Sequence, residues 1–486
     1  MKQARAVALA VLVVGAGLAG VVPATATGGP VAETPEAVAE TPEENASTPI
    51  DARAPPELPE EWQRTYGGSG DDIFADLVKT DDGGYLLVGW TESGGSRDAW
   101  IVKTDGEGER EWSKTLGGPG TDRFWGVTRA GEGYLLAGRT DADGAKGWVV
   151  ELNPAGEVRD ERVLGSGAFY AVESREAEAG TEYLLAGWTP GDGGNAGWAV
   201  KLAGDLSESW QTGYRTPDEY SDGYLRAVVP TDSGYYLAGK IEGDSDDAWA
   251  LRIEDDGSKA WQATAGGPDR DDVWAAASGS VEGNASAGVL VAGETESDST
   301  GPRDGWLVKF GADGAVEWER RPGGEGTQWL DSAMRTEQGY LVTGGSDAGP
   351  KGDVDGYVVM TDEEGETNWT NYYGTDGWDK PWPAIRDDGG YVLAGQTSGN
   401  GAQAKDGWLV RIGEESSSPG TTVSSENVTI ETTTTADGGE DADDTTNEAI
   451  QGETETVTEE PEGSVPGFGV GAAVLALAVA LLVLRR

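Results

Sequence analysis

The chain has 486 residues and a formal charge of −52, which arises from 87 acidic and 35 basic residues, and it contains neither histidine nor cysteine. This composition excludes disulfides, thiolate nucleophiles, Cys/His zinc sites and Ser-His-Asp triads, and no basic stripe is present that would bind nucleic acid. Carboxylate chemistry and oxygen-ligated cations stay available.

The acidic residues are spread through the whole chain, whereas a calcium-buffering acidic protein would cluster them. Molar salt shortens the electrostatic screening length to about 3 Å, so a densely carboxylated surface becomes tolerable and keeps the protein soluble. The composition therefore predicts a halophilic protein that works in a high-salt environment.

The first 26 residues have the pattern of a secretory signal peptide. A basic start precedes an apolar run over 6–22, and Ala-Thr-Ala at 24–26 is a small-X-small cleavage site. We expect residues 1–26 to be removed, which makes the mature protein extracytoplasmic; a retained signal anchor is the alternative. Residues 27–57 are rich in Pro, Glu and Ala without a hydrophobic period, and they predict a disordered spacer.

One short apolar motif recurs seven times, beginning with GYLLVG at 84–89 and ending with GYVLAG at 390–395. The copies lie about fifty residues apart, a spacing that is typical of repeat folds. Each run is too short for a helix and predicts a strand that is buried on both faces. A second strand follows each motif, and its leading aromatic residues are Trp100, Trp148, Trp198, Trp249, Trp306, Tyr357 and Trp408.

Another tryptophan stands twelve residues after the leading aromatic in five repeats, and Gly stands four positions before it in four of those five. This spacing predicts a β-hairpin with glycine at its turn and a tryptophan ring packed between neighbouring repeats. The second repeat has Asp160 in the tryptophan position, so that contact is not expected there. The five tryptophans are Trp112, Trp210, Trp261, Trp318 and Trp369.

A further strand, rich in β-branched, aromatic and alanine residues, precedes each motif. Four strands in each of seven repeats predict an all-β fold, a seven-bladed β-propeller of four-stranded blades, over residues 58–413. The last repeat lacks its outer strand, while Trp62 stands in an orphan strand before the first repeat. We expect these two ends of the repeat array to pair and close the ring.

The Asp, Gly and Trp spacing around each hairpin resembles the tryptophan-docking repeats of quinoprotein-type (PQQ-like) propellers, although most turns here have Gly rather than Thr-Gly. The resemblance implies the propeller fold. It carries over no catalytic residue and no quinone cofactor.

Carboxylates recur where the chain enters the innermost strand of a blade. Loops at this end open around the channel of a propeller, on the face that usually binds ligands. The carboxylates could jointly hold a hard cation such as Ca²⁺, but we favour the alternative that each one accepts hydrogen bonds from its own turn. We interpret the Asp that leads the third strand of five blades (Asp98, Asp247, Asp304, Asp355 and Asp406) in the same way. The candidate cation ligands are Asp72, Asp122, Asp222, Asp272 and Asp376.

Residues 414–465 are rich in Thr, Ser, Glu and Asp and predict a glycosylated stalk. Asn-X-Ser/Thr acceptors favour N-glycosylation at Asn45 and Asn427 in the tails and at Asn284 in a loop insertion. The acceptor at Asn368 is not favoured, because it adjoins a tryptophan that we expect to be packed.

The C-terminal segment 466–486 begins with Pro466, Gly467 and Phe468, continues as a short apolar run and ends in two arginines. The run predicts a hydrophobic helix of marginal length for a bilayer, with the basic tip in the cytoplasm. This ending resembles the PGF-type sorting signal of archaeal, especially haloarchaeal, surface proteins. The resemblance implies processing by an archaeosortase, with the helix replaced by a lipid near Pro466; a retained transmembrane anchor is the alternative.

Together these features predict a cell-surface protein on the extracellular face of the cytoplasmic membrane, and no catalytic motif is found. We favour a binding, adhesion or envelope module that contacts glycans, envelope proteins or cations. A carboxylate-dependent glycosidase or lyase acting on extracellular polysaccharide is the alternative. An enzyme should break the repeat pattern at one place, and the only such cluster of aromatic and acidic residues combines Trp329 and Asp331 with the segment 378–382.

Overall fold

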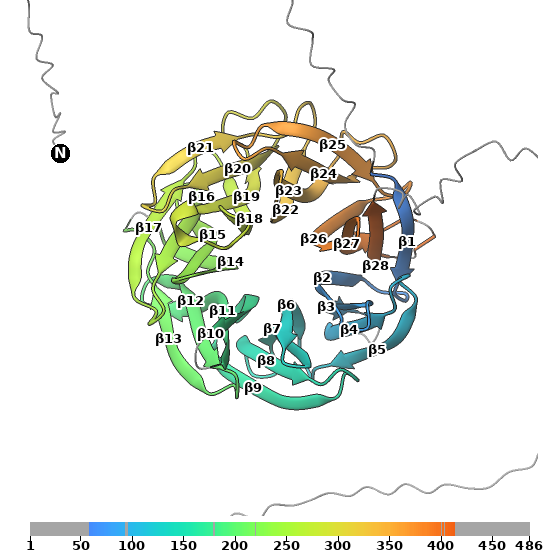
Figure 1. The fold of residues 1–486 in the computed structure, drawn as a ribbon, viewed down its shortest axis with the longest axis horizontal. Coiled ribbons are helices and arrows are strands. Elements are labelled where there is room, and N and C mark those ends of the chain that lie inside the picture. The colour runs from blue at the N-terminus through green and yellow to red at the C-terminus, as the bar shows by residue number, and fades with distance from the viewer. Residues whose placement is uncertain are drawn as a thin grey trace, which may run out of the picture. The chain divides into compact units, whose positions relative to one another are not determined.

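The computed structural model describes residues 58–413, apart from 93–95, 178–179, 219, 400 and 403. The predicted signal peptide, spacer, stalk and sorting segment lie outside these residues. The described residues form 28 β-strands in seven four-stranded antiparallel sheets, arranged around a central axis (Figure 1). The predicted all-β, seven-bladed propeller is therefore confirmed.

Each blade runs from an innermost strand beside the axis to an outermost strand at the rim (Figure 1). The first blade contains β2 (Asp72–Lys79), β3 (Tyr85–Thr91), β4 (Asp98–Thr104) and β5 (Arg110–Leu116). The second contains β6 (Arg123–Ala130), β7 (Gly133–Thr140), β8 (Lys146–Leu152) and β9 (Val158–Ser166). The third contains β10 (Ala168–Ala177), β11 (Gly180–Gly191), β12 (Gly194–Ala203) and β13 (Glu208–Tyr214).

The remaining blades continue the same order around the ring. The fourth contains β14 (Asp222–Thr231), β15 (Gly234–Glu242), β16 (Asp246–Ile253) and β17 (Lys259–Ala265). The fifth contains β18 (Asp271–Ser278), β19 (Val289–Thr295), β20 (Asp304–Phe310) and β21 (Val316–Arg320). The sixth contains β22 (Gln328–Thr336), β23 (Gly339–Ser346), β24 (Asp355–Thr361) and β25 (Thr367–Tyr373), and the seventh contains β26 (Asp379–Asp387), β27 (Gly390–Thr397), β28 (Asp406–Gly413) and β1 (Glu60–Tyr66).

The burial of the strands follows from their apolar patterns. In β3, which carries the first copy of the repeated motif, every residue is buried, as expected for a strand that is covered by neighbouring blades on both faces. The outermost strand β5 alternates between exposed and half-buried residues, because one of its faces is open to solvent. The core therefore consists of the middle strands and one face of the innermost strands, packed blade against blade.

The N-terminal strand β1 closes the ring. It pairs antiparallel with β28, with Trp62 opposite Arg411 and Thr65 opposite Trp408. The last blade thus takes its outer strand from the other end of the repeat array, as the sequence predicts, and neither end leaves an unpaired middle strand.

Outer-strand tryptophans connect neighbouring blades. A Cβ added at Gly156 would lie 2.5 Å from the ring of Trp112, and Gly156 has a positive φ of 73°, so the turn needs glycine both for its conformation and for the ring above it. The predicted packing of these rings between repeats is confirmed. The same arrangement joins Trp62 to Gly108, Trp210 to Gly257, Trp261 to Gly314 and Trp318 to Gly365.

The helical content of the described residues is a single 3₁₀ turn, Ala285–Ala287, in the loop before β19. Within residues 58–413, no helix is long and apolar enough to span a membrane.

Candidate functional site

Every innermost strand carries a β-bulge at the same position. In the first blade, Phe74 pairs with Gly89 and Asp76 pairs with Val88, so Ala75 is the extra residue. A Cβ at Gly89 would overlap the carbonyl oxygen of Ile73, so the last glycine of the repeated motif is needed for the close approach of the two backbones. The extra residues of the seven bulges include Ala75, Trp125, Tyr170, Arg226, Trp274, Asp331 and Trp382.

These seven bulge residues all line one cavity on the axis of the ring. The cavity has a volume of about 570 Å³, which falls within the usual range of small-molecule sites. The scaffold repeats, but the side chains at this position do not, since they are aromatic, cationic, anionic or small. The fold does not dictate the side chain at this position, and the cavity that these residues line is our candidate ligand site. We call these seven residues the bulge ring.

Aromatic rings form an arc along the cavity wall. Trp90 lies with its ring centroid 5.5 Å from that of Trp382 and 6.1 Å from that of Trp125. Trp125 in turn contacts Tyr170 edge to face, at 5.0 Å between centroids. Trp274 lines the same cavity from the fifth blade. Such rings provide flat apolar surfaces with polar N–H or O–H edges.

Two arginines in the cavity stack on these rings. The guanidinium of Arg123 lies 5.0 Å from the centroid of Trp90 and 5.6 Å from that of Trp125, and the guanidinium of Arg226 lies 3.7 Å from that of Trp274. The Nε atom of each is buried without a hydrogen-bond partner among the described residues. Cation–π contacts, rather than carboxylates, therefore hold both charges in place.

Lys380 occupies a different environment in the same cavity. Its ammonium lies 3.0 Å from a carboxylate oxygen of Asp331 and between 5.3 and 5.8 Å from the ring centroids of three tryptophans. Burial nevertheless raises the pKa of Asp331 to about 6, against the effect of the lysine. The three rings are those of Trp274, Trp329 and Trp382. Of the cluster of aromatic and acidic residues that breaks the sequence repeat, Asp331, Lys380 and Trp382 line the cavity.

Two further carboxyl groups of the cavity also have raised pKa values. Asp76 accepts hydrogen bonds from the N–H groups of Leu77 (2.9 Å) and Val127 (2.8 Å), yet burial raises its pKa to about 7. Glu173 is exposed to the cavity, but the surrounding protein desolvates it, and this desolvation, with the charge of Asp76, raises its pKa to about 8. Below neutral pH the positive charges of the cavity therefore outnumber the negative ones.

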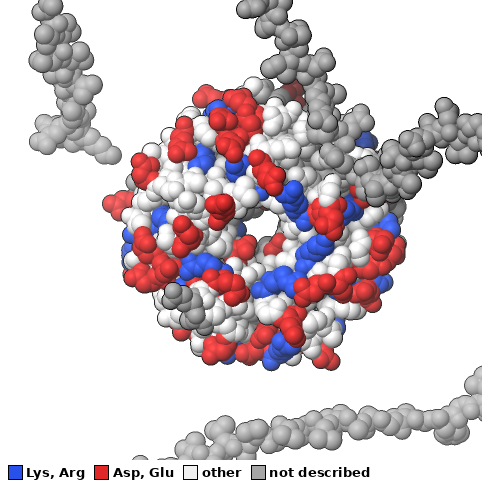
Figure 2. Space-filling model, viewed as in Figure 1, with Lys and Arg blue, Asp and Glu red and all other residues white. Residues whose placement is uncertain are grey.

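The mouth of the channel carries basic side chains as well. Figure 2 shows several Lys and Arg beside the central opening, among Asp and Glu that are spread over the face in view. Arg270 and Arg303 line a hollow that shares Trp274 and Lys380 with the cavity. Both are paired with carboxylates, Arg270 at 2.6 Å from Asp272 and Arg303 at 2.8 Å from Glu294, whereas Arg123 and Arg226 are not.

The candidate cation ligands Asp72 and Asp122 lie at the start of the innermost strands and are buried. A carboxylate oxygen of Asp72 accepts the N–H of Gly68 at 2.7 Å, and one of Asp122 accepts the N–H of Gly118 at 2.8 Å. Each side chain therefore caps the turn four residues before it. In the fifth and seventh blades the same contact is made by Asp271 and Asp379.

The other three candidates occupy different positions. Asp222 accepts the N–H of Asn195 in the neighbouring blade at 2.8 Å, Asp272 pairs with Arg270, and Asp376 is exposed in a loop. The sequence spacing was therefore wrong by one residue in the fifth blade and by three in the seventh. The structure does not gather the five candidates into one cluster, and the residues that it describes contain no group of three or more potential metal ligands.

Of the five Asp residues that lead third strands, two cap a turn in the same way, whereas Asp247 accepts the hydroxyl of Tyr220. Asp304 accepts the N–H of Thr300 at 2.8 Å, and Asp355 accepts that of Lys351 at 2.7 Å. Of the glycosylation candidates, Asn284 is exposed and caps the 3₁₀ turn through a 2.9 Å hydrogen bond from the N–H of Ser286. Asn45, Asn427, Pro466, Gly467 and Phe468 lie outside the described residues.

Sequence reasoning singled out Asp331 and the segment that contains Trp382, but it missed the bulge ring as a set, because its members share no residue type. The usable signal was the invariant final glycine of each buried motif. That glycine pairs with the residue just before the bulge in every blade, for example with Phe124 and Phe169. If the residues of the hairpin had been paired from this glycine back into the preceding strand, the residue after its partner would have been identified as the extra residue of the bulge.

No family model matches the chain, and no curated protein matches its sequence. Solved structures with a similar arrangement include Sqt1 from Chaetomium thermophilum (11% identity, 71% of this chain and 87% of the other, TM-score 0.43). The polysaccharide lyase Uly1 (10%, 71% and 90%, 0.44) and an apocarotenoid oxygenase mutant from Synechocystis (11%, 70% and 88%, 0.43) are further examples. At these identities and TM-scores, none of the likenesses bears on what this chain does.

Proposed function

We propose that this protein is an exported cell-surface binding module, and that its ligand site is the cavity inside the bulge ring. The single observation that carries the proposal is that seven equivalent positions of a repeating scaffold carry non-equivalent side chains, all of which line one cavity. Ligand sites combine apolar walls with a few placed polar groups, and this cavity combines tryptophan rings with uncommitted guanidinium groups.

The proposed location at the cell surface rests on the sequence. The signal peptide, the Thr- and Ser-rich stalk, and the PGF-like ending support export and attachment by a membrane helix or a lipid. The charge of −52 supports a high-salt environment. Surface proteolysis of intact cells should release peptides from residues 58–413, and the mature mass should lack residues 1–26. Recovery of the chain from the cytoplasm would contradict this part of the proposal.

A second candidate function is hydrolysis or elimination in a polysaccharide. The observation that favours it is the set of carboxyl groups with raised pKa values, since a general acid must keep its proton near neutral pH. Asp76, with a pKa of about 7, is the candidate acid. Glycans incubated with the protein would then show new reducing ends or the ultraviolet absorbance of an unsaturated product.

The test of the binding site is a glycan screen of the full chain in molar salt, repeated with single substitutions. Trp125→Ala and Trp274→Ala remove rings from the cavity and should weaken binding of any hit. Trp188→Ala is the matched control, because Trp188 is a half-buried tryptophan that does not line the cavity. Hits that do not respond to the two cavity substitutions, or a screen without hits, would argue against the cavity as the site.

A further inference from the structure

We infer that the cavity selects acidic saccharides, with Arg123 and Arg226 contacting the carboxylate or sulfate groups of the ligand. This inference rests on the proposed function, because it names the ligand class of the same site. It goes further in assigning the charge of the ligand and the two residues that recognise it.

The first argument is the state of the two arginines. The protein has 87 acidic residues for 35 basic ones, so a carboxylate partner is readily available to most cations. Arg270 and Arg303 at the channel mouth have such partners. Arg123 and Arg226 instead rest on tryptophan rings, and neither forms an ion pair with a carboxylate in the described part of the chain. A guanidinium group whose N–H donors lack acceptors is costly, and an anionic ligand in the cavity would supply them.

The second argument is the excess of donors over acceptors. The indole N–H groups of Trp90 and Trp382, which line the cavity, also have no hydrogen-bond partner among the described residues. Of the carboxyl groups of the cavity, Asp76 accepts two backbone N–H groups and Asp331 pairs with Lys380, which leaves the second oxygen of Asp331 and the Glu173 carboxyl as acceptors for these donors and for the guanidinium groups. A complementary ligand must therefore supply many acceptor oxygens.

The third argument concerns the shape and surface of the ligand. The cavity is walled by several tryptophans and a tyrosine, which pack against flat apolar surfaces. A pyranose ring has such C–H faces, and hydroxyl and carboxylate oxygens surround them. A cavity of about 570 Å³ suits a short oligosaccharide or the end of a chain better than the side of a polymer.

The net charge of the protein does not prevent this binding. At 1 M salt the screening length is about 3 Å, so the acidic outer surface does not repel a distant anion. A bound ligand displaces water from the cavity, and contacts in such a desolvated site are screened much less, so Arg123 and Arg226 keep their attraction for a bound anion.

The experiment compares two ligands that differ only in charge. Hexameric oligogalacturonate and its fully methyl-esterified form are titrated calorimetrically against the full chain in molar NaCl, and a sulfated galactan hexamer is a third probe. We expect an acidic probe to bind at least about tenfold more tightly than the ester, which is the size of one charge-assisted hydrogen bond. The better acidic probe then identifies carboxylate or sulfate as the recognised group.

Substitutions assign the preference to residues. Arg226→Gln and Arg123→Gln should each remove most of the preference for the acidic probe while leaving the affinity for the ester unchanged, and Arg226→Lys should restore part of it. Arg110→Gln is the control, because Arg110 is exposed on the outer strand β5 and its loss changes the net charge equally. Thermal melting verifies that each variant is folded.

The outcomes separate this inference from the proposed function. Equal affinity for the acid and the ester, with both lost in Trp274→Ala, would overturn the charge selection and leave the binding site intact. A preference that survives in both glutamine variants would also overturn it. If none of the three probes binds and no glycan in the wider screen depends on Trp125 or Trp274, both proposals fail.

Discussion

The two sides of the third blade (β10–β13) are joined to their neighbours in different ways. Toward the fourth blade, Trp210 lies over Gly257 and donates its N–H to the carbonyl oxygen of Asp255 at 2.9 Å. Toward the second blade, the tryptophan position is occupied by Asp160, and the glycine position by Leu206. We call these the docked junction and the undocked junction.

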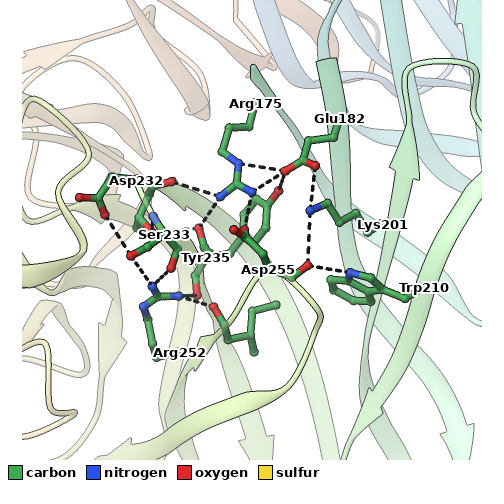
Figure 3. Close-up of polar contacts among 12 residues, drawn as sticks. Arg175, Glu182, Lys201, Trp210, Asp232, Ser233, Tyr235, Arg252 and Asp255 are labelled. Atoms are coloured by element: carbon green, nitrogen blue, oxygen red, sulfur yellow. Dashed lines mark hydrogen bonds and ion pairs between the residues drawn. The ribbon is translucent and has the colours of Figure 1, made fainter. Parts of the chain in front are cut away.

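Polar contacts increase the contrast. At the docked junction, Arg175 pairs with both Glu182 and Asp255, and the hydroxyl of Tyr235 donates to Glu182 at 2.7 Å (Figure 3). At the undocked junction, the hydroxyl groups of Thr128 and Ser174 are hydrogen-bonded at 3.0 Å, and no ion pair joins β6–β9 to β10–β13 among the described residues. Apolar packing carries most of this junction, through the cluster that includes Leu206.

The comparison shows that docking needs two matched residues. Leu206 has a φ of 61°, a conformation that favours glycine, yet leucine is accommodated because no ring lies above it. Its side chain is 2% exposed and belongs to the core. Loss of the ring and loss of the glycine are therefore one coupled change. We expect the closed circle of blades to open first at the undocked junction, because fewer hydrogen bonds and ion pairs hold that junction together.

The largest effect is expected from breaking the docked junction. Trp210→Ala removes the ring over Gly257 and the partner of the Asp255 carbonyl, which should cost about 3 kcal/mol of unfolding free energy. Denaturant unfolding in molar salt measures this loss. Trp188→Ala removes a ring of the same junction that contacts Tyr224 edge to face but lies over no glycine, and it should cost only about 1 kcal/mol. Equal losses in the two variants would mean that docking does not stabilise the junction.

A smaller effect is expected from the polar contacts of the same junction. Arg175→Met keeps the length of the side chain but leaves Glu182 and Asp255 without the guanidinium, at a cost of about 2 kcal/mol. At the undocked junction Thr128→Val removes one hydroxyl contact and should cost no more than about 1 kcal/mol. The same unfolding measurement compares the two, and a larger loss for Thr128→Val would reverse our ranking of the junctions.

The undocked junction can also be converted. Asp160→Trp alone should gain nothing, because the Leu206 side chain blocks the ring, and Leu206→Gly alone should lose buried apolar surface. The double variant should recover the docked geometry, with a favourable coupling energy of about 1.5 kcal/mol in the double-mutant cycle. Additive effects would show that the two positions are independent, and our interpretation of the lost tryptophan and the lost glycine as one coupled change would then be wrong.

The same contrast explains how much could be predicted from the sequence. The sequence period of about fifty residues predicted the features that recur in the blades. These are the strands, the docking tryptophans and the closing strand around Trp62. Asp271 and Asp379 were missed as the residues that cap the turns before the innermost strands. Other acidic residues stand next to or near them, so the repeat alignment could not tell which acid occupies the capping position. Arg226 and Trp274 were missed because a bulge adds one residue to the strand, which changes the face that every later side chain points to. Periodicity reveals what the blades share, whereas the candidate site is built from what they do not share.

The smallest effect is expected from pH, on the channel side of the first three blades. Asp76 in β2 and Glu173 in β10 have pKa values raised to about 7 and about 8, well above the usual value near 4 of an unfolded carboxyl. At a pH between the unfolded and the folded pKa values, the folded state binds more protons than the unfolded state. Stability must therefore fall as the pH rises from about 5 to about 8.5. The charges that face these groups across the cavity belong to Arg123, Arg226, Lys380 and Asp331.

We expect a loss of only about 1 kcal/mol over this range, because water in the channel and molar salt screen the charges. Asp76→Asn should flatten the dependence of stability on pH, and Asp160→Asn, which changes a half-buried carboxylate at the undocked junction, should leave it unchanged. Unfolding at several pH values measures both. Binding of an acidic saccharide should weaken over the same range as the two carboxyl groups ionise beside it. Stability that rises with pH in this window would contradict the desolvation of these groups and the excess of positive charge that we assign to the cavity at low pH.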